Sequence, residues 1–132
     1  MGLLMVPVGF DHGKYQLELA IKCRECFTDL VWTGPVTLHF EDKLNPEPDI
    51  IGWLDGNPYI VVEISNSTQK ADFGYKKASY EANGIPFYVV FELRERKLYT
   101  WGLVKDKYVE SPEFLKPFEN AMVDVTRSPN NR

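Results

Sequence analysis

The sequence predicts an α/β domain in which a mixed β-sheet is flanked by helices. Residues 48–54 and 58–65 are rich in Ile, Val, Trp and Tyr and enclose a turn, which is typical of a β-hairpin. A helical pattern follows the hairpin directly, and residues 87–91 then form an uninterrupted apolar run. Such a run is expected for a central strand covered on both faces. Because a helix separates this strand from the hairpin, the two can pair in parallel, which gives a mixed sheet.

The length and composition are those of one globular domain, with 132 residues, 44% hydrophobic residues and a net charge of −4. We expect its core to cover about residues 14–110 and residues 126–132 to be frayed. The acidic pI of about 5.2 argues against a general nucleic-acid coat protein, although a local basic patch can still bind phosphate. Residues 1–6 are expected to form a short strand or an apolar arm. They lack the basic flank of a signal peptide, and no apolar run reaches membrane-spanning length, so the cytoplasm is the expected location.

The first helix is predicted over residues 14–30, where apolar side chains recur at helical spacing: Leu17, Ile21, Phe27 and Leu30. His12 precedes this helix, and the sequence pattern offers it no partner. Cys23 and Cys26 lie within the helix and are the only cysteines. A zinc site needs four ligands, so both cysteines are expected to be reduced side chains of the helix.

A strand is predicted after the break at Thr33-Gly34-Pro35, because residues 36–41 alternate apolar with polar side chains. His39 falls on the polar face of this strand and is expected to be solvated. Residues 42–47 are polar and connect the strand to the hairpin.

The loop of the hairpin decides whether its two acidic residues meet. A three-residue loop at 55–57 sets Asp49 directly opposite Glu63. Their Cβ atoms would then be about 4.5–5.5 Å apart on one face of the sheet. A two-residue loop at Asp55-Gly56 would instead pair Asp49 with Val62 and turn Glu63 to the other face. An acidic pair therefore requires the longer loop.

Glu63 is the more informative acid because it lies inside the apolar run 59–64. An unpaired carboxylate in such a run costs several kcal/mol. Two adjacent carboxylates repel, so either one is protonated or a cation lies between them. A divalent cation such as Mg²⁺, held by one or two carboxylates and water, satisfies the pair. Pairing of Glu63 with a Lys or Arg, or a place on a solvated edge strand, explains this residue as well.

The helix after the hairpin adds a cation and a polar face. Ser67-Thr68 can cap it, Asn83-Gly84 closes it, and between them Asp72, Lys76 and Tyr80 recur at i, i+4 and i+8. A lysine in its first turns can direct its ammonium group toward the acidic pair. Two acids, a divalent cation and a lysine suit phosphodiester hydrolysis, because the cation activates water and the lysine stabilises charge.

The remaining chain is expected to extend the sheet. Glu92 follows the central apolar run and is expected at an edge. Residues 94–97 form a charged turn, for which solvation is the simpler explanation and phosphate contact the alternative. Residues 97–104 and then 108–109 have the pattern of further strands. From Ser111 the chain is expected to be looser.

Several short motifs occur in this sequence in the order found in a known protein family. They are Pro48-Asp49, Val62-Glu63-Ile64-Ser65, Asp72-Phe73-Gly74-Tyr75-Lys76 with Tyr80, Gly84-Ile85-Pro86 and Tyr88. With this combination the chain resembles the Uma2 family, small restriction endonuclease-like proteins of bacteria within the PD-(D/E)XK nuclease superfamily. The similarity is continuous from about residue 46 to 93, and residues 118–125 resemble the closing segment of the family.

The resemblance implies a restriction-endonuclease-like core in which Asp49 and Glu63 are metal ligands and Ile64 contributes its backbone carbonyl. In the superfamily pattern a lysine usually stands two places after the acid, where this sequence has Ser65. The helix must then supply the cation, and Lys76 matches the helix-borne lysine of the family.

Further residues have supporting roles under this resemblance. Asp72 and Tyr80 are expected beside the site, with Tyr80 orienting the lysine. Lys77 is the other lysine that could supply the cation, although it points about 100° away around a helix. Glu18 is the candidate for the acid that the first helix of superfamily members often offers, and a solvated glutamate explains it equally well.

The function implied by the resemblance is that of a metal-dependent endonuclease that hydrolyses DNA phosphodiester bonds, with Asp49, Glu63 and Lys76 as catalytic residues. Mg²⁺ or Mn²⁺ is the expected cofactor and DNA the expected partner. Superfamily nucleases often act as homodimers, and three aromatic residues could serve such an interface or pack in the core: Tyr99, Trp101 and Tyr108. The competing hypothesis is a non-catalytic nucleic-acid-binding or regulatory module that keeps the nuclease fold, which Ser65 and the acidic composition favour.

Overall fold

The computed structural model of the chain describes residues 9–66 and 70–126. The expected arm at 1–6, the expected cap at Ser67-Thr68 and residues 127–132 of the expected frayed end lie outside the described residues. The elements are α1 (Phe10–Cys26), β1 (Val31–Thr33), β2 (Ile50–Leu54), β3 (Asn57–Ser65), α2 (Lys70–Phe73), α3 (Tyr75–Ala82), β4 (Phe87–Glu92), β5 (Lys97–Val104), β6 (Lys107–Glu110), a 3₁₀ turn (Glu113–Leu115), α4 (Lys116–Ala121) and α5 (Val123–Thr126).

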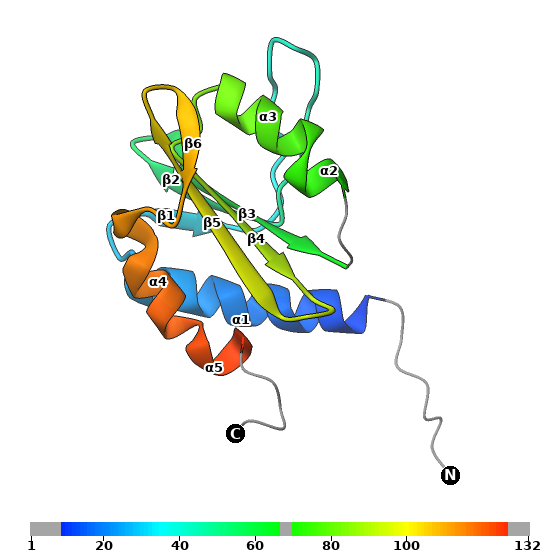
Figure 1. Ribbon diagram of the computed structural model, residues 1–132, viewed down its shortest axis with the longest axis vertical. Helices are drawn as coiled ribbons and strands as arrows, with labels where there is room; N and C mark the ends of the chain where they lie inside the picture. Colours follow the sequence, from blue (N-terminus) through cyan, green and yellow to red (C-terminus); the bar gives the residue numbers. More distant parts are fainter. Residues whose placement is uncertain (1–8, 67–69, 127–132) are drawn as a thin grey trace.

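The described strands form one sheet in which spatial order follows chain order, from β1 at one edge to β6 at the other. Within it β3 and β4 pair in parallel, while the other neighbours are antiparallel. Helices α1, α4 and α5 lie on one face of the sheet, and α2 and α3 lie on the other (Figure 1). The mixed sheet flanked by helices is therefore the α/β architecture predicted from the sequence.

The core under α1 includes the C-terminal segment. Its buried residues are Leu19, Cys23, Phe27, Ile50, Ile60, Val62, Ile64, Val89, Phe91, Leu115, Phe118, Met122 and Val125. The expectation of a loose chain after Ser111 was therefore wrong, because four of these residues follow it at helical spacing. Pro117, which suggested irregular chain, stands in the first turn of α4, where proline is tolerated.

The apolar face predicted for α1 was also misplaced. The helix begins at Phe10 and ends at Cys26, earlier than predicted at both ends. Leu17 and Ile21, which supported the prediction, are 65% and 50% exposed. Leu19 is fully buried instead, and the earlier start brings His12 into the helix.

The predicted strand at residues 36–41 is instead part of an irregular loop before β2. Leu38, one of the apolar residues of the alternation, is buried in the core. Its N–H donates to the carbonyl of Pro46 within the loop at 2.8 Å, and not to a neighbouring strand. The loop is tied to α3 because Ser79 Oγ donates a hydrogen bond to Asp42 at 2.9 Å. This loop and the α2–α3 pair cover the second core cluster, whose buried members include Tyr80, Tyr88 and Trp101.

The hairpin between β2 and β3 has a two-residue turn. Leu54 pairs with Asn57, which leaves Asp55 and Gly56 as the turn residues. Their φ angles are 51° and 80°, and positive φ at both central positions is what a type I′ turn requires. The three-residue loop considered necessary for the acidic pair is therefore not present.

A β-bulge restores the register that the short turn would have changed. The pairing shifts at the boundary of Gly52 and Trp53, so that Tyr59 is an extra residue on β3. Beyond the bulge the paired residue numbers have the same sum as they would with a three-residue loop. Asp49, which precedes β2, is consequently in register with Glu63.

Two further local predictions need correction. The helix predicted after the hairpin is divided at Gly74 into α2 and α3. Glu92 is 2% exposed rather than at an edge, because its strand lies between β3 and β5. Its carboxylate accepts the N–H groups of Arg94 at 3.1 Å and Glu95 at 2.7 Å, which satisfies it inside the sheet.

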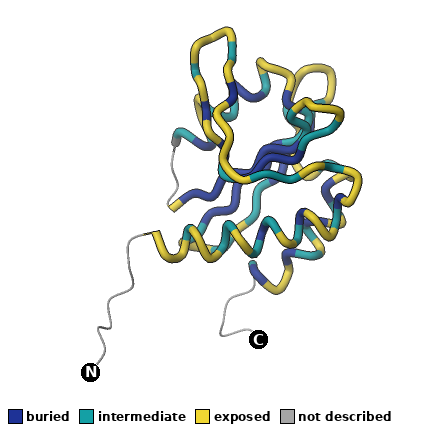
Figure 2. The backbone as a smooth tube through the Cα atoms, turned by 180° about the vertical axis from the view of Figure 1, so that it is seen from behind, coloured by how far each residue is buried: buried dark blue, intermediate teal, exposed yellow. Residues whose placement is uncertain are grey.

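Burial is concentrated in the central strands, and the exposed chain lies mainly in loops and on the outer sides of helices (Figure 2). Trp101 is buried, and the hydroxyl of Tyr108 donates to the carbonyl of Ile85 at 2.8 Å. These aromatic residues are thus accounted for by packing within the chain. In the part of the chain that is described, no helix is long and apolar enough to cross a membrane.

Candidate active site

A cleft of about 320 Å³ opens where β2 begins and β3 ends. It is lined by residues of α1, the loop before β2, β3, α2 and α3: His12, Glu47, Asp49, Glu63, Ile64, Ser65, Asn66, Ala71, Asp72 and Lys76. The bulged register of the hairpin and the placement of α3 across the sheet bring Asp49, Glu63 and Lys76 into this one cavity. Asp72 shares it, so the cleft contains several acidic groups and one lysine.

Three groups hold Asp49 in place. His12 Nε2 lies 3.1 Å from Asp49 Oδ1, and the N–H of Ile64 donates to Asp49 Oδ2 at 2.7 Å. Gln16 Nε2, one helical turn after His12, donates to the main-chain carbonyl of Asp49 at 2.9 Å. The first half of α1 therefore fixes both the backbone and the carboxylate of this residue.

The backbone of Ile64 faces the Asp49 side of β3. In a strand, the N–H and C=O of one residue point toward the same neighbour, and the next residue points the opposite way. The N–H of Ile64 points to Asp49, while the carbonyl of Ser65 points to β4 and accepts the N–H of Leu93 at 2.8 Å. The Ile64 carbonyl is therefore directed to the side of β3 where Asp49 lies.

Glu63 is a buried carboxyl group in the cleft, with 4% of its surface exposed. The hydroxyl of Tyr80 donates to Glu63 Oε2 at 2.8 Å, and Lys76 Nζ lies 3.8 Å from the same oxygen. Burial raises the pKa of Glu63 to about 7, although Lys76 and the Tyr80 hydrogen bond oppose this shift. The nearby carboxylates of Asp49 and Asp72 add to the increase.

Lys76 connects Glu63 with Asp72. Its Nζ atom is 3.2 Å from Asp72 Oδ1, an oxygen that is buried and makes no well-aligned hydrogen bond among the described residues. Burial of the ammonium group lowers the pKa of Lys76, but the carboxylates of Glu63 and Asp72 raise it further, so that it lies above its ordinary value. Lys76 is therefore a charged group at neutral pH.

Tyr80 lies behind Glu63 and is fully buried. Burial, together with the adjacent Glu63 carboxylate, raises the pKa of the Tyr80 hydroxyl, so this group remains a hydrogen-bond donor. The ring of Tyr88 is tilted against that of Tyr80 at a centroid distance of 4.9 Å, and its hydroxyl donates to the main-chain carbonyl of Asp72 at 2.8 Å. The two tyrosines thus anchor both acids from the side of the core.

Two other predicted residues are not brought into the cleft. Lys77 Nζ lies 4.8 Å from the centre of the Trp101 ring, over β5. Glu18, on α1, is absent from the residues that line the cavity. Of the two lysines considered for the cation, Lys76 is the one beside the acids.

The contribution of α1, which is made by His12 and Gln16, was not predicted. Their spacing of four residues places them on one face of a helix, and this signal was readable in the sequence. It was overlooked because the helix was predicted to begin at residue 14, beyond His12. Glu47, which lines the cleft and accepts a hydrogen bond from Thr37 at 3.0 Å, was also not predicted.

The donors of the cleft suit a hard divalent cation. Among the described residues, no three His, Cys, Asp or Glu side chains are grouped so that they could hold a metal ion. The oxygens of Asp49 and Glu63 and the Ile64 carbonyl are nonetheless hard ligands. Mg²⁺ is commonly bound by one or two carboxylates with water and substrate phosphate rather than by a complete protein cage.

The sequence of the chain matches the model of a known protein family. The family model Uma2, whose description is "Putative restriction endonuclease", matches residues 3–127, nearly the whole chain. No curated protein matches the chain. The match includes α1 and the C-terminal helices as well as the hairpin and α3, so every element that lines the cleft lies inside the matched region.

Proposed function

The chain belongs to the Uma2 family of restriction endonucleases, and from this premise we propose that it is a metal-dependent endonuclease acting on DNA in the cleft. Family membership implies nuclease activity and DNA as the substrate class. The observation that supports the cleft as its site is Glu63, a buried carboxyl group that shares one cavity with Asp49, Asp72 and a lysine. Burying a carboxyl group costs free energy, and groups that are kept buried in a cleft at such a cost are concentrated at functional sites.

In this proposal, Asp49, Glu63 and the Ile64 carbonyl hold Mg²⁺ or Mn²⁺. A bound divalent cation supplies Lewis acidity and lowers the pKa of bound water. Asp49 is suited to this role because His12, Gln16 and the Ile64 N–H fix its position before any cation arrives. Preorganised ligands lose little conformational freedom on binding.

Lys76 acts as a fixed positive charge in the proposed mechanism. Its raised pKa favours the charged form, so it stabilises negative charge on the phosphate or attacking oxygen rather than abstracting a proton. The ammonium group forms an ion pair with Asp72 at 3.2 Å, and the Tyr80 hydroxyl donates a hydrogen bond to the neighbouring Glu63 oxygen. The lysine on the helix thereby compensates for Ser65, which stands where the superfamily pattern usually has lysine.

The test combines calorimetric Mn²⁺ titration with cleavage of a supercoiled plasmid in Mg²⁺ or Mn²⁺. We expect wild type to bind Mn²⁺ saturably and to cut the plasmid. Glu63→Gln should lose both properties, because it removes a ligand charge. Lys76→Met should keep Mn²⁺ binding and lose about 100-fold or more in cleavage rate, the size expected for loss of one charge-stabilising group.

Matched controls separate these effects from loss of folding, which circular dichroism monitors. Lys77→Met removes the adjacent lysine, which lies over Trp101, and should leave cleavage unchanged. Glu92→Gln alters a second buried glutamate that serves the β4–β5 turn and should leave Mn²⁺ binding unchanged. Absence of metal binding and of cleavage in the folded wild type would instead favour the non-catalytic module.

A further inference from the structure

The turn between β4 and β5 begins beside the cleft. Ser65, which lines the cleft, is in register with Glu92 on β4, and Glu92 with Lys97 on β5. Neighbouring strands lie about 4.8 Å apart, so the backbone of Lys97 is about 10 Å from that of Ser65. The N–H of Leu93, the first residue of the turn, donates to the Ser65 carbonyl at 2.8 Å.

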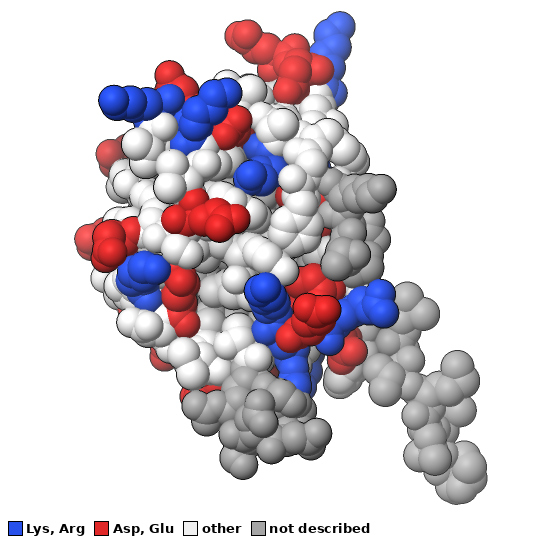
Figure 3. All heavy atoms as spheres, in the orientation of Figure 1, with Lys and Arg blue, Asp and Glu red and all other residues white. Residues whose placement is uncertain are grey.

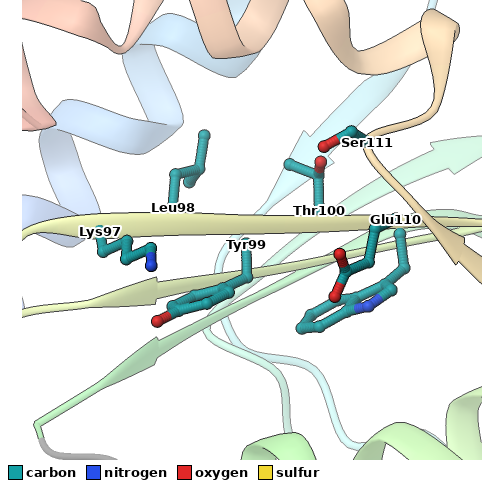
Figure 4. A pocket seen from close by; sticks show the side chains of 7 residues that line it. Lys97, Leu98, Tyr99, Thr100, Glu110 and Ser111 are labelled. Carbon is teal, nitrogen blue, oxygen red and sulfur yellow. The ribbon is translucent and has the colours of Figure 1, made fainter.

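Lys97 projects on the same face of the sheet as Glu63. Residues directly opposite in a sheet point to the same side, and Glu63, Val90 and Tyr99 form one such row. Lys97 and Tyr99 lie together on one side of β5, whereas Leu98 and Thr100 lie on the other (Figure 4). Lys97 Nζ is 5.1 Å from the centre of the Tyr99 ring.

The backbone of the turn is fixed by Glu92, and the guanidinium groups of its two arginines are not engaged in ion pairs among the described residues. The buried Glu92 carboxylate accepts the N–H groups of Arg94 and Glu95, so the backbone of the turn is fixed. Among the described residues, the side chains of Arg94 and Arg96 enter no ion pair, in contrast to Lys76 in the cleft. Lysine and arginine side chains lie around the tip of this hairpin among acidic ones, on a face where both charges occur (Figure 3).

We propose that this basic turn, formed by Arg94, Arg96 and Lys97, binds the phosphate backbone of the DNA substrate beside the scissile phosphate. Guanidinium groups bind phosphate oxygens in bidentate fashion, and phosphate contacts position a protein on DNA without reading its sequence. With a net charge of −4 the protein as a whole repels DNA, and a local basic surface offsets that repulsion where the substrate approaches. The inference rests on the proposed nuclease function, since it assigns the substrate contacts of that cleft.

The chain offers a closely matched control. Arg94-Glu95-Arg96 in the β4–β5 turn and Lys105-Asp106-Lys107 at the start of β6 each place two cations around one acid, at opposite ends of β5. The variants Arg94→Gln with Arg96→Gln, and Lys105→Gln with Lys107→Gln, therefore remove the same charge at different distances from the cleft. The four side chains are exposed or half-buried, and thermal unfolding checks that both variants are folded.

The experiment measures binding of a fluorescently labelled DNA duplex of mixed sequence as a function of salt, with EDTA present to prevent cleavage. Each phosphate contact contributes about −0.9 to the slope of log K against log salt, so the arginine variant should lose about two units of slope. It should also bind about tenfold more weakly at moderate salt, while the lysine variant should match wild type in slope.

Each other outcome overturns the inference in a distinguishable way. Equal losses in both variants would show that overall charge, and not this turn, controls binding. An arginine variant that binds as wild type does would remove the turn from the interface while leaving the cleft proposal intact. Failure of wild type to bind DNA even at low salt would count against the proposed nuclease function and remove the inference with it.

Discussion

The environment of Glu63 favours its protonated form in the protein without metal. Burial raises its pKa from 4.5 to about 7, and Lys76 and Tyr80 offset only part of the effect. Between these two values the folded state binds a proton that the unfolded state has released. The free energy of unfolding therefore falls as the pH rises through this window. A rise in pH favours the state that binds fewer protons, which here is the unfolded state.

The variant Glu63→Gln should remove this pH dependence. At pH 4 and below, wild type and variant should have similar free energies of unfolding, because both side chains are then largely uncharged in the folded and in the unfolded state. By pH 8 the variant should be the more stable by about 3 kcal/mol, the equivalent of the pKa shift. Urea denaturation in EDTA across this pH range measures the difference.

The control for this prediction is Glu92→Gln, which changes a buried glutamate whose carboxylate is satisfied by two N–H groups. Its stability relative to wild type should not show the same increase between pH 5 and pH 8. Parallel pH profiles for wild type and Glu63→Gln would mean that Glu63 is ionised in the folded state throughout. The attraction of Lys76 would then outweigh burial.

Strands β1 and β2 pair closely at Gly52, where the neighbouring strand leaves no room for a side chain. Trp32 on β1 is opposite Gly52, and its indole N–H donates to the Phe27 carbonyl at 3.1 Å, which fixes the ring. A Cβ atom added at Gly52 would lie 2.7 Å from the nearest atom of that ring. The ring therefore cannot remain in place when any side chain is introduced.

Gly52→Ala should destabilise the protein by about 1–3 kcal/mol, the usual cost of overpacking. Gly13→Ala is the control, because a Cβ there meets no atom within 4 Å. As Gly13 lies in α1, alanine should stabilise it by about 0.5–1 kcal/mol. Urea denaturation followed by tryptophan fluorescence measures both, and a change of the same sign in the two variants would contradict this account.

The hairpin shows which part of the fold is readable from sequence. The two strands, their turn residues and the acidic pair were predictable because β-rich runs around Asp55-Gly56 are a strong local signal. The bulge at Tyr59 was not, because a bulge depends on how the strand packs against the rest of the sheet. It is the bulge that keeps Asp49 in register with Glu63 while allowing the short turn.

The cleft was predictable only in part for a related reason. Asp49, Glu63 and Lys76 could be identified because charges in or beside apolar runs are conspicuous and match family motifs. His12 was not assigned, although its spacing of four residues from Gln16 is readable, because that spacing has meaning only once the start of α1 and the packing of this helix against the sheet are known. Long-range contacts of this kind decide which residues line the cleft, and they leave little trace in the local periodicity of the sequence.

At the scale of the whole molecule, the C-terminal helices complete the core without touching the cleft. Phe118 is 1% exposed and its ring lies 6.4 Å from that of Phe27 on the other side of the α1–α4 contact. The cleft is lined by α1, the loop before β2, β3, α2 and α3, with no contribution from α4 or α5 among the described residues. Stability and ligand binding should therefore be separable.

Phe118→Ala should lower the free energy of unfolding by about 3–5 kcal/mol, because it leaves a cavity in the core. Phe10→Ala makes the same chemical change at a position that is 53% exposed, and it should alter stability by no more than about 0.5 kcal/mol. Mn²⁺ affinity of the folded Phe118 variant should equal that of wild type, since distant sites contribute independently. If Phe118→Ala proves too unstable to purify, Phe118→Leu tests the same contact with a smaller cavity. A folded Phe118 variant with weakened Mn²⁺ binding would show that α4 and the cleft are coupled through α1, which carries both His12 and the surface that α4 packs against.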